Sequence, residues 1–335
     1  MADAFRGPGS NFPDGFNAVT IRGVPITQSH PGRVFWVSNA TTIKIGQTPG
    51  GSNGNPGTYE APFGTIDYAI GMCQAGRGDV IFVKPGHAET VTTTTIAMDV
   101  ADIAIIGLGV GSLRPTLTFS VTTTGSVIQV SANNMSITNM LCVATGAAVT
   151  TVFNCATATT AKDFAVENCE FRDSSTSLGF TAIVKAADAN SMDGLYFARN
   201  KVFGQKSGPT ANTTAVVMAA AQDRMALMDN LLIHSITLAA PVLLQMGATN
   251  ATNLEVGYNK AFRPTTDVSV GSLIGTSSTA SSGYVYNNYS WHIDSAGNNG
   301  LLIPTGSKLG FQQNYCHITS AGVGDASGVL NPAAV

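Results

Sequence analysis

Carboxylate residues recur in the middle of the chain at a spacing that could serve glycan hydrolysis. Glu167 and Asp229 each stand directly before an asparagine, in the similar segments "FAVENCEF" (164–171) and "MALMDNLLI" (225–233). If those segments are strands two coils apart, the carboxylates lie about 9.6 Å apart, which fits an inverting glycosidase. Arg199 takes the same place in the segment between them. A guanidinium between two carboxylates keeps both ionised and leaves no general acid, so we interpret the three as a structural ion ladder.

The other reactive side chains give no stronger site. Arg172 stands among Glu167, Glu170 and Asp173, which favours a solvated strand face over a calcium site. The histidines are scattered, and the cysteines, which form no Cys-x-x-Cys pair, are typical of small buried side chains in a reducing compartment. They are Cys73, Cys142, Cys155, Cys169 and Cys316. We predict no catalytic residue, no cofactor and no metal site.

A glycine cluster in "DIAIIGLGVGSLRP" (102–115) imitates a dinucleotide-binding turn. Gly107, Gly109 and Gly111 follow an apolar run, but Ser112 stands where the fingerprint requires its third glycine. Pro115 and the β-branched run after it favour a strand where the fingerprint needs a helix. The expected acidic ribose ligand is also missing from the following residues. The glycines are therefore predicted to be turn residues between strands.

Composition excludes several classes of partner. The 335 residues include 17 basic and 20 acidic side chains, so that 11% of the chain is charged and the net charge is −3. Without a basic patch we expect no nucleic-acid partner. Without a polybasic tract or an apolar run of about 20 residues we expect no membrane partner. The first residues contain no apolar segment typical of Sec export, so we expect synthesis in the cytoplasm.

The elements that must position these residues form an internal repeat. Segments with alternating apolar residues and one asparagine recur seven times, at steps of 29, 32, 30, 29, 29 and 26 residues. The asparagines are Asn139, Asn168, Asn200, Asn230, Asn259, Asn288 and Asn314. A second short apolar segment recurs between them, and no repeat contains a convincing amphipathic helix.

Two short strands per repeat, one repeat per coil, predict an all-β parallel β-helix (solenoid) of about eight coils. Asparagine tolerates the left-handed backbone conformation that a bend between two strands requires. Stacked asparagines can also exchange amide hydrogen bonds from coil to coil. We therefore predict that the seven asparagines form a structural ladder at the corners. Aligning the strands puts Gly107 at the same corner.

The ends of the chain complete the predicted organisation. Residues 1–32 are rich in glycine and proline and are expected to form an extended arm, followed by a single β-helix domain over 33–335. Thr65 is a predicted N-cap of a short amphipathic helix at about 64–75. Such a helix would cover the open edge of the first coil, which would otherwise invite aggregation.

"GTYEAPFGTIDYAIG" (57–71) and "GRGDVIFVKPGHAETV" (76–91) resemble the opening of right-handed parallel β-helix proteins of the pectate-lyase-like superfamily. Residues 33–335 as a whole are similar to the β-helix virion proteins of tailed bacteriophages. Those proteins include trimeric capsid decoration proteins and tailspikes that cleave surface glycans, and the wider superfamily includes polysaccharide lyases. The resemblance implies a right-handed β-helix and a location in the virion.

Our leading hypothesis is a non-enzymatic virion protein, a homotrimeric capsid decoration (cement) protein on the capsid surface. The arm is too short for the particle-binding domain of a tailspike, but Phe5, Phe12, Pro13 and Phe16 could contact the major capsid protein in a groove of the lattice. The alternative is that the arm is a terminus that does not bind the capsid. The competing functions are a tailspike-like glycan depolymerase using Glu167 or Asp229, and a fibre adhesin that binds a host surface glycan.

Aromatic residues gather near the C-terminal end of the repeat. Trp291, Tyr284, Tyr286 and Tyr289 lie within eight residues of one another. They could form a sugar-binding platform, because aromatic side chains combine an apolar face with a polar edge. The alternative, which the sequence favours, is aromatic stacking in a late coil or burial at a subunit contact.

Overall fold

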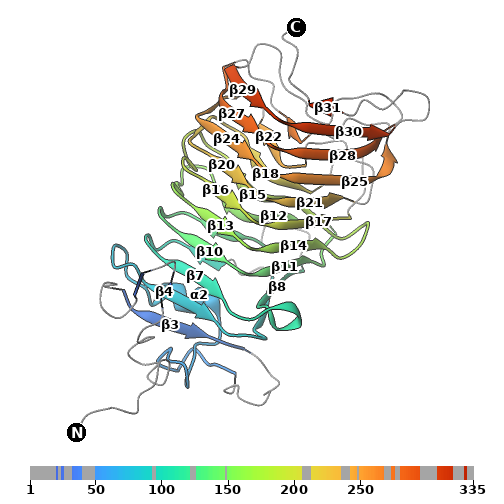
Figure 1. Cartoon of the computed structure of the whole chain (residues 1–335). Helices are drawn as coiled ribbons and strands as arrows, with labels where there is room; N and C mark the ends of the chain where they lie inside the picture. Colours follow the sequence, from blue (N-terminus) through green and yellow to red (C-terminus); the bar gives the residue numbers. More distant parts are fainter. Residues whose placement is uncertain are drawn as a thin grey trace. The chain divides into compact units, whose positions relative to one another are not determined.

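The computed structural model divides the chain into two compact units (Figure 1). The N-terminal unit comprises Met1–Glu89 and Val100–Thr116, and the solenoid unit comprises Thr90–Asp99 and Leu117–Val335. The structure describes residues 20–21, 24–25, 32–39, 50–92, 96–120, 126–147, 149–205, 213–234, 242–246, 249–267, 273–275, 280–294, 308–319 and 328–329.

The N-terminal unit contains three parallel strands, β3 (Val34–Val37), β4 (Val80–Val83) and β7 (Ala104–Gly107). The strands carry almost continuous apolar runs, as is typical of strands covered on both faces. Trp36, Val80 and Phe82 are buried together, with Tyr59 packed against them. The unit also contains a two-stranded hairpin, β1 (Thr20–Ile21) and β2 (Val24–Pro25), and a short 3-10 helix, η2 (Gly111–Leu113).

The predicted helix exists but is shorter than expected. Helix α2 spans Ile66–Gly71, inside the predicted range of 64–75, and contacts β3 and β4 through its buried side. Thr65 is its N-cap, as predicted, and its side chain accepts a hydrogen bond from the Tyr68 N–H. The helix stops early because the Gln74 N–H donates to the buried Asp79 carboxylate at 2.8 Å, which draws the chain away from the helix axis. That α2 covers the edge of the first coil stays a prediction.

The solenoid unit consists of three stacks of parallel strands, drawn from green to red in Figure 1. Sheet 1 contains β10 (Ser136–Thr138), β13 (Ala165–Glu167), β16 (Tyr196–Ala198), β20 (Ala226–Met228), β24 (Leu254–Gly257), β27 (Ser282–Tyr286) and β29 (Lys308–Gln312). Sheet 2 contains β11 (Leu141–Ala144), β14 (Glu170–Asp173), β17 (Lys201–Gly204), β21 (Leu231–His234), β25 (Lys260–Asp267), β28 (Tyr289–Asp294) and β30 (Tyr315–Thr319). Sheet 3 contains β6 (Ile96–Met98), β9 (Ile128–Val130), β12 (Val149–Cys155), β15 (Phe180–Ala186), β18 (Thr214–Met218), β22 (Leu244–Met246) and β26 (Ile274–Gly275).

Further short strands complete the assignment. β31 (Gly328–Val329) pairs antiparallel with β30, and β19 (Gln222–Asp223) pairs parallel with β23 (Ala251–Thr252). β5 (Ala88–Val91) and β8 (Thr116–Phe119) each include residues of both units. The predicted parallel β-solenoid is confirmed, whereas the number of coils stays a prediction.

The core runs along the inside of the stacks. In sheet 1 one apolar residue per strand points inward and pairs in register with its counterpart in the next strand. These residues are Ile137, Val166, Phe197, Leu227, Val256 and Val285, all at most 1% exposed. Because neighbouring residues along a strand face opposite ways, the residues on either side of this column face outward.

Each sheet 1 strand is short because a left-handed corner follows it. The residues at this corner have φ between 50° and 59° although none is glycine, and such conformations are uncommon outside Asn and Asp. They are Asn139, Asn168, Arg199, Asp229, Tyr258, Asn287 and Gln313. A second left-handed corner precedes several of the strands, at Asn134, Asp163, Gly194, Arg224 and Asn253. The asparagine repeat in the sequence does not mark this second column.

The expectation for Gly107 was wrong. Gly107 is the last residue of β7 and pairs with Val83, so it continues a strand and does not take the corner position. Within this glycine cluster, Gly109 and Gly111 have a left-handed backbone conformation, with φ of 97° and 58°. A Cβ on Gly109 would lie 2.6 Å from the Leu113 carbonyl oxygen, so this turn accepts only glycine. Gly109 and Gly111 are therefore turn residues, as predicted.

Candidate functional site

The predicted asparagine ladder exists, but only five of the seven asparagines belong to it. Asn200, Asn230, Asn259, Asn288 and Asn314 are at most 1% exposed and form one buried column. Asn139 and Asn168 instead occupy the left-handed corner that directly follows a sheet 1 strand, with φ of 58° and 53°. The two groups differ because the five buried asparagines come one residue after the left-handed corner. The prediction that the asparagines themselves make the bend is therefore correct for Asn139 and Asn168 and wrong for the other five.

The buried asparagines join successive coils. The Asn230 side-chain amide donates to the Phe197 carbonyl of the preceding coil at 2.9 Å and to Asn259 Oδ1 of the next coil at 2.9 Å. The Asn230 backbone N–H donates to the same Asn259 oxygen at 3.0 Å. The pattern repeats from Asn259 to Asn288 and from Asn288 to Asn314. Buried amides with all partners present stabilise a unique packing, whereas an unpaired one would be costly.

Cys169 and Met140 continue the column at the N-terminal end of the ladder. The Cys169 N–H donates to Asn200 Oδ1 at 2.9 Å, and the Met140 N–H donates to the Cys169 sulfur at 3.5 Å. Cys169 therefore replaces an asparagine as acceptor. Cys142, Cys155 and Cys169 are buried, as the sequence predicted, whereas Cys73 is only partly buried. Burial raises the pKa of the Cys142 thiol well above its usual range, which makes it a poor nucleophile.

The carboxylates expected to form one ladder lie in two different columns. Glu167 is the last residue of β13 and pairs with Ala198, whereas Arg199 and Asp229 are left-handed corner residues. Arg199 still reaches Glu167 and forms an ion pair with it, as predicted. Asp229 stands at an exposed corner of the next coil. Glu167 and Asp229 are therefore not equivalent positions two coils apart, and the argument that placed them as a hydrolytic pair does not hold.

The expectation of a solvated acidic face was also wrong. Glu170 and Asp173 are 8% and 4% exposed. Glu170 forms an ion pair with Arg172. Asp173 accepts hydrogen bonds from the Phe180 N–H at 2.9 Å, the Gln205 N–H at 2.9 Å and the Thr213 hydroxyl at 2.8 Å. Asp173 faces inward, where it fastens loops that leave the sheets. Glu170 lies on the same face of β14 as the exposed Arg172.

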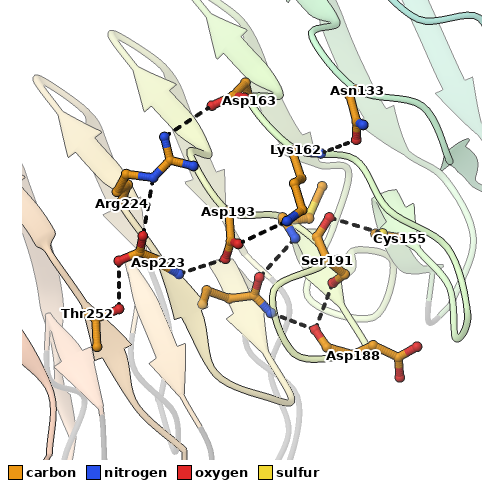
Figure 2. Close-up of polar contacts among 12 residues, drawn as sticks. Asn133, Cys155, Lys162, Asp163, Asp188, Ser191, Asp193, Asp223, Arg224 and Thr252 are labelled. Atoms are coloured by element: carbon orange, nitrogen blue, oxygen red, sulfur yellow. Dashed lines mark hydrogen bonds and ion pairs between the residues drawn. The ribbon is translucent and has the colours of Figure 1, made fainter.

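A second ladder, at the corner before sheet 1, was not identified from the sequence. Figure 2 shows Lys162, Asp193, Asp223 and Thr252, which come from successive coils and contact one another in order. Lys162 Nζ lies 3.4 Å from Asp193 Oδ2, and Asp193 Oδ1 accepts from the Asp223 N–H at 2.9 Å. The Thr252 hydroxyl donates to Asp223 Oδ1 at 2.6 Å. We name these four residues the polar corner.

Electrostatics at the polar corner favour ionised carboxylates. Hydrogen bonds from Thr252 and Asn253, and the neighbouring guanidinium of Arg224, hold the pKa of Asp223 below its usual range (Figure 2). Arg224 also lies 3.2 Å from Asp223 and 4.0 Å from Asp163. A carboxylate held ionised by such partners serves as an acceptor of hydrogen bonds between coils and is poorly suited to donate a proton. The signal in the sequence was the recurrence of Asp or Asn before five of the sheet 1 strands, β10, β13, β16, β20 and β24.

The predicted aromatic residues differ in exposure. Tyr284 is 71% exposed. Tyr289 is 38% exposed and its ring packs against Phe262 with centroids 5.9 Å apart, in line with the favoured alternative of aromatic stacking in a late coil. Tyr286 is half-buried and stacks edge-to-face on Tyr258 with ring centroids 5.4 Å apart. The Tyr286 hydroxyl donates to Glu255 at 2.6 Å, and this hydrogen bond raises the pKa of Tyr286 to about 12. The ring of Trp291 packs against Phe262 at 6.5 Å.

Phe5, Phe12, Pro13 and Phe16, the predicted capsid contacts, lie outside the described residues. Within the described ranges, no group of three or more His, Cys, Asp or Glu side chains could hold a metal ion. In the same part of the chain, no helix is both long and apolar enough to cross a membrane.

Comparison with known proteins gives distant likenesses only. The chain matches no known protein family and no curated protein. Among solved structures it is similar to a rhamnogalacturonan lyase, with 14% identity over 88% of this chain and 86% of that chain and a TM-score of 0.31. It is also similar to ORF18 of Geobacillus virus E2, with 14% identity, 78% of this chain covered and a TM-score of 0.22. The match spans 59% of that viral protein, and at this identity neither likeness extends beyond the fold.

Proposed function

We propose that this chain is a non-enzymatic structural protein of a tailed-bacteriophage virion, a homotrimeric decoration protein that stabilises the capsid lattice. The observation that carries the proposal is the buried asparagine ladder. It joins successive coils through side-chain and backbone hydrogen bonds within the chain itself. A solenoid whose coils are fastened in this way resists distortion, which is what a protein that reinforces a shell requires.

The environment of the carboxylates supports a role without catalysis. Glycan hydrolysis needs one carboxyl group that keeps its proton near neutral pH beside a second that is ionised. Glu167 and Glu170 form ion pairs with arginines, and Asp173 accepts three hydrogen bonds. In each of these arrangements the carboxylate is held by partners from the chain itself. They suit a side chain that fastens the coils.

The composition supports a trimer that binds the major capsid protein. Only 11% of the residues are charged, so three solenoids can pack side by side with little charge to desolvate. Closed symmetry is the usual arrangement of identical subunits. The arm over residues 1–32 carries Phe5, Phe12 and Phe16 with Pro13, and an aromatic-rich segment of that kind can become ordered in a groove of the capsid.

A particle reconstitution experiment tests the location. Capsids assembled without this chain are mixed with the purified protein, and bound protein is located by cryo-electron microscopy. We expect density on the capsid surface and a higher temperature of DNA release. A variant with Phe5, Phe12 and Phe16 changed to Ala should stay trimeric but lose capsid binding, whereas Tyr68→Ala, an exposed tyrosine of the N-terminal unit, should bind normally. Density confined to the tail would contradict the proposal.

Two solution measurements test the remaining parts. Sedimentation velocity should give the mass of a trimer, and a stable monomer at micromolar concentration would count against it. Incubation with host capsule or lipopolysaccharide, followed by a reducing-end assay and by the absorbance of unsaturated products, should show no turnover. Turnover that the Glu167→Gln substitution abolishes would overturn the non-enzymatic role.

A further inference from the structure

The last coils of the solenoid unit expose an unusual concentration of aromatic rings. Among the described residues, seven large apolar or aromatic side chains are exposed, and four of them are tyrosines between residues 258 and 315. The tyrosine surface comprises these four and their half-buried neighbour: Tyr258, Tyr284, Tyr286, Tyr289 and Tyr315. Its residues belong to β27, β28 and β30 or, in the case of Tyr258, to the corner between sheets 1 and 2 (Figure 1). Exposed aromatic patches on soluble proteins mark binding sites.

The strand register makes the tyrosine surface continuous. Tyr289 pairs with Tyr315 of the next coil. The two therefore lie on neighbouring parallel strands, whose backbones are about 4.8 Å apart. Tyr286 pairs with Gly257, and Tyr258 contacts Tyr286 across the corner. The coil repeat is close to the length of one pyranose residue. Successive coils therefore present successive rings to a ligand chain that runs along the solenoid.

Two glycines leave room for tyrosine rings to lie on the sheet. A Cβ on Gly310 would be 3.1 Å from Cδ1 and 3.2 Å from Cε1 of Tyr284, so this ring lies directly over the Gly310 backbone. A Cβ on Gly257 would be 2.8 Å from Cζ of Tyr286. A ring supported from below by backbone, and 71% exposed in the case of Tyr284, offers its other side to solvent. Such a ring is fixed in place before a ligand arrives, which lowers the entropic cost of binding.

The polar groups around the rings suit a neutral, hydroxyl-rich ligand. Gln312 and Gln313 are exposed beside the rings, and Asn287 is partly exposed at the same corner. Side-chain amides both donate and accept hydrogen bonds, so they match pairs of hydroxyl groups. The formal charges nearby, which include Asp229, Glu255 and Lys260, are of both signs. A phosphate backbone would need a basic groove, which this mixture does not provide.

We propose that the tyrosine surface binds a neutral polysaccharide. Tyr289 and Tyr315 of the next coil stack on successive sugar rings, Tyr284 stacks on a sugar ring at the other side of the corner, and the flanking amides hold hydroxyl groups. Binding of this kind goes beyond the proposed capsid role and requires no cleavage. It would give the protein a second activity, attachment to a carbohydrate surface. The tyrosine surface does not include the residues of the arm, so its binding and capsid attachment can succeed or fail independently.

A printed array of neutral microbial polysaccharides, probed with the full-length protein, tests the proposal. The strongest polysaccharide is then titrated against the protein by affinity electrophoresis. The Tyr284→Ala, Tyr289→Ala double variant should raise Kd by roughly tenfold or more, the usual effect of removing central aromatic contacts. Tyr284→Phe, which keeps the ring, should bind nearly as the parent does. Gly310→Val should also weaken binding, because its side chain would displace the Tyr284 ring.

A matched control lies in the same register column. Tyr196 of β16 occupies the same register position as Tyr284 of β27, three strands away in sheet 1. Because Tyr196 is not part of the tyrosine surface, Tyr196→Ala should leave Kd unchanged. Circular dichroism and thermal unfolding confirm that each variant is folded. The proposal is overturned when no neutral polysaccharide retains the protein, or when the double variant binds as the parent does. It is also overturned when the double variant dissociates the oligomer, because a second copy of this chain is then the occupant.

Discussion

The side-chain amide of Asn259 and its own backbone N–H both donate to Oδ1 of Asn288, at 2.9 Å and 3.0 Å. The same amide donates its second hydrogen to the Leu227 carbonyl at 2.8 Å. Asn259 Oδ1 in turn accepts two hydrogen bonds from Asn230. One buried side chain therefore satisfies polar groups of three coils, and its loss would leave several of them without partners at once.

Asn259→Ala should lower the free energy of unfolding by roughly 3–5 kcal/mol, because each buried polar group left unpaired costs about 1–3 kcal/mol. The groups affected are the Leu227 carbonyl and the two Asn230 donors. Urea unfolding followed by circular dichroism measures the change. Gln312→Ala, at an exposed position of β29, is the control and should change stability by less than about 0.5 kcal/mol. Equal effects of the two substitutions would contradict a ladder that carries stability.

Substitutions of the corner residue Asp229 should distinguish the effect of backbone strain on stability from the effect of side-chain contacts. Its φ of 55° is costly for β-branched residues, so Asp229→Val should destabilise the protein by about 1–2 kcal/mol. Asp229→Gly should stay within about 0.5 kcal/mol of the parent, since glycine accepts this conformation but costs chain entropy. Ala226→Val, in the extended strand β20 of the same coil, controls for the added volume. If Val is tolerated at residue 229 as well as at residue 226, strain at the corner is not the cause.

The fold could be predicted because the repeat is visible as a period. The seven asparagine segments recur at 26 to 32 residues, and the inward residues of sheet 1 keep the same period in the structure. The role of individual asparagines could not be predicted from that period. Asn168 stands two residues after the inward Val166, whereas Asn200 stands three residues after the inward Phe197. This difference of one residue moves the asparagine from the exposed corner to the buried ladder.

The same shift explains the errors at the candidate site. Aligning residues by the asparagines put Glu167 and Asp229 in one column, although Glu167 belongs to a strand and Asp229 to a corner. Counting from the inward apolar residue would have separated them. The inward turn of Asp173 could not be found in this way, because its partners at Phe180, Gln205 and Thr213 come from loops whose paths the repeat does not determine.

The Thr252 hydroxyl should set the ionisation of Asp223 at the polar corner. It donates to Asp223 Oδ1 at 2.6 Å and is the largest influence that lowers the pKa of this carboxylate. Thr252→Val removes the donor and keeps the shape, so the pKa of Asp223 should rise toward its usual value. Carboxyl-detected NMR titration measures the shift. Thr252→Ser, which keeps the hydroxyl, should titrate like the parent, and a matching rise in this variant would assign the effect to packing.

The carboxylate of Asp79 should make the stability of the N-terminal unit depend on pH. Burial opposes its ionisation, but Arg77, at 2.7 Å and 2.6 Å, and the N–H groups of Gln74 and Arg33 outweigh burial and hold its pKa below the usual value. A lowered folded-state pKa adds stability that is complete above the unfolded pKa of about 4. This stability is lost as pH falls through the folded pKa.

Arg77→Ala should therefore destabilise the N-terminal unit strongly at pH 7 and progressively less below about pH 4, where protonation of Asp79 removes the ion pair from the parent as well. The fluorescence of the buried Trp36, recorded in a Trp291→Phe background, reports unfolding of this unit. Arg33→Ala is the matched control, because Arg33 contacts Asp79 through its backbone N–H, which the substitution retains. A destabilisation by Arg77→Ala that is the same at pH 7 and pH 3 would show that the guanidinium acts through packing and not through the charge of Asp79.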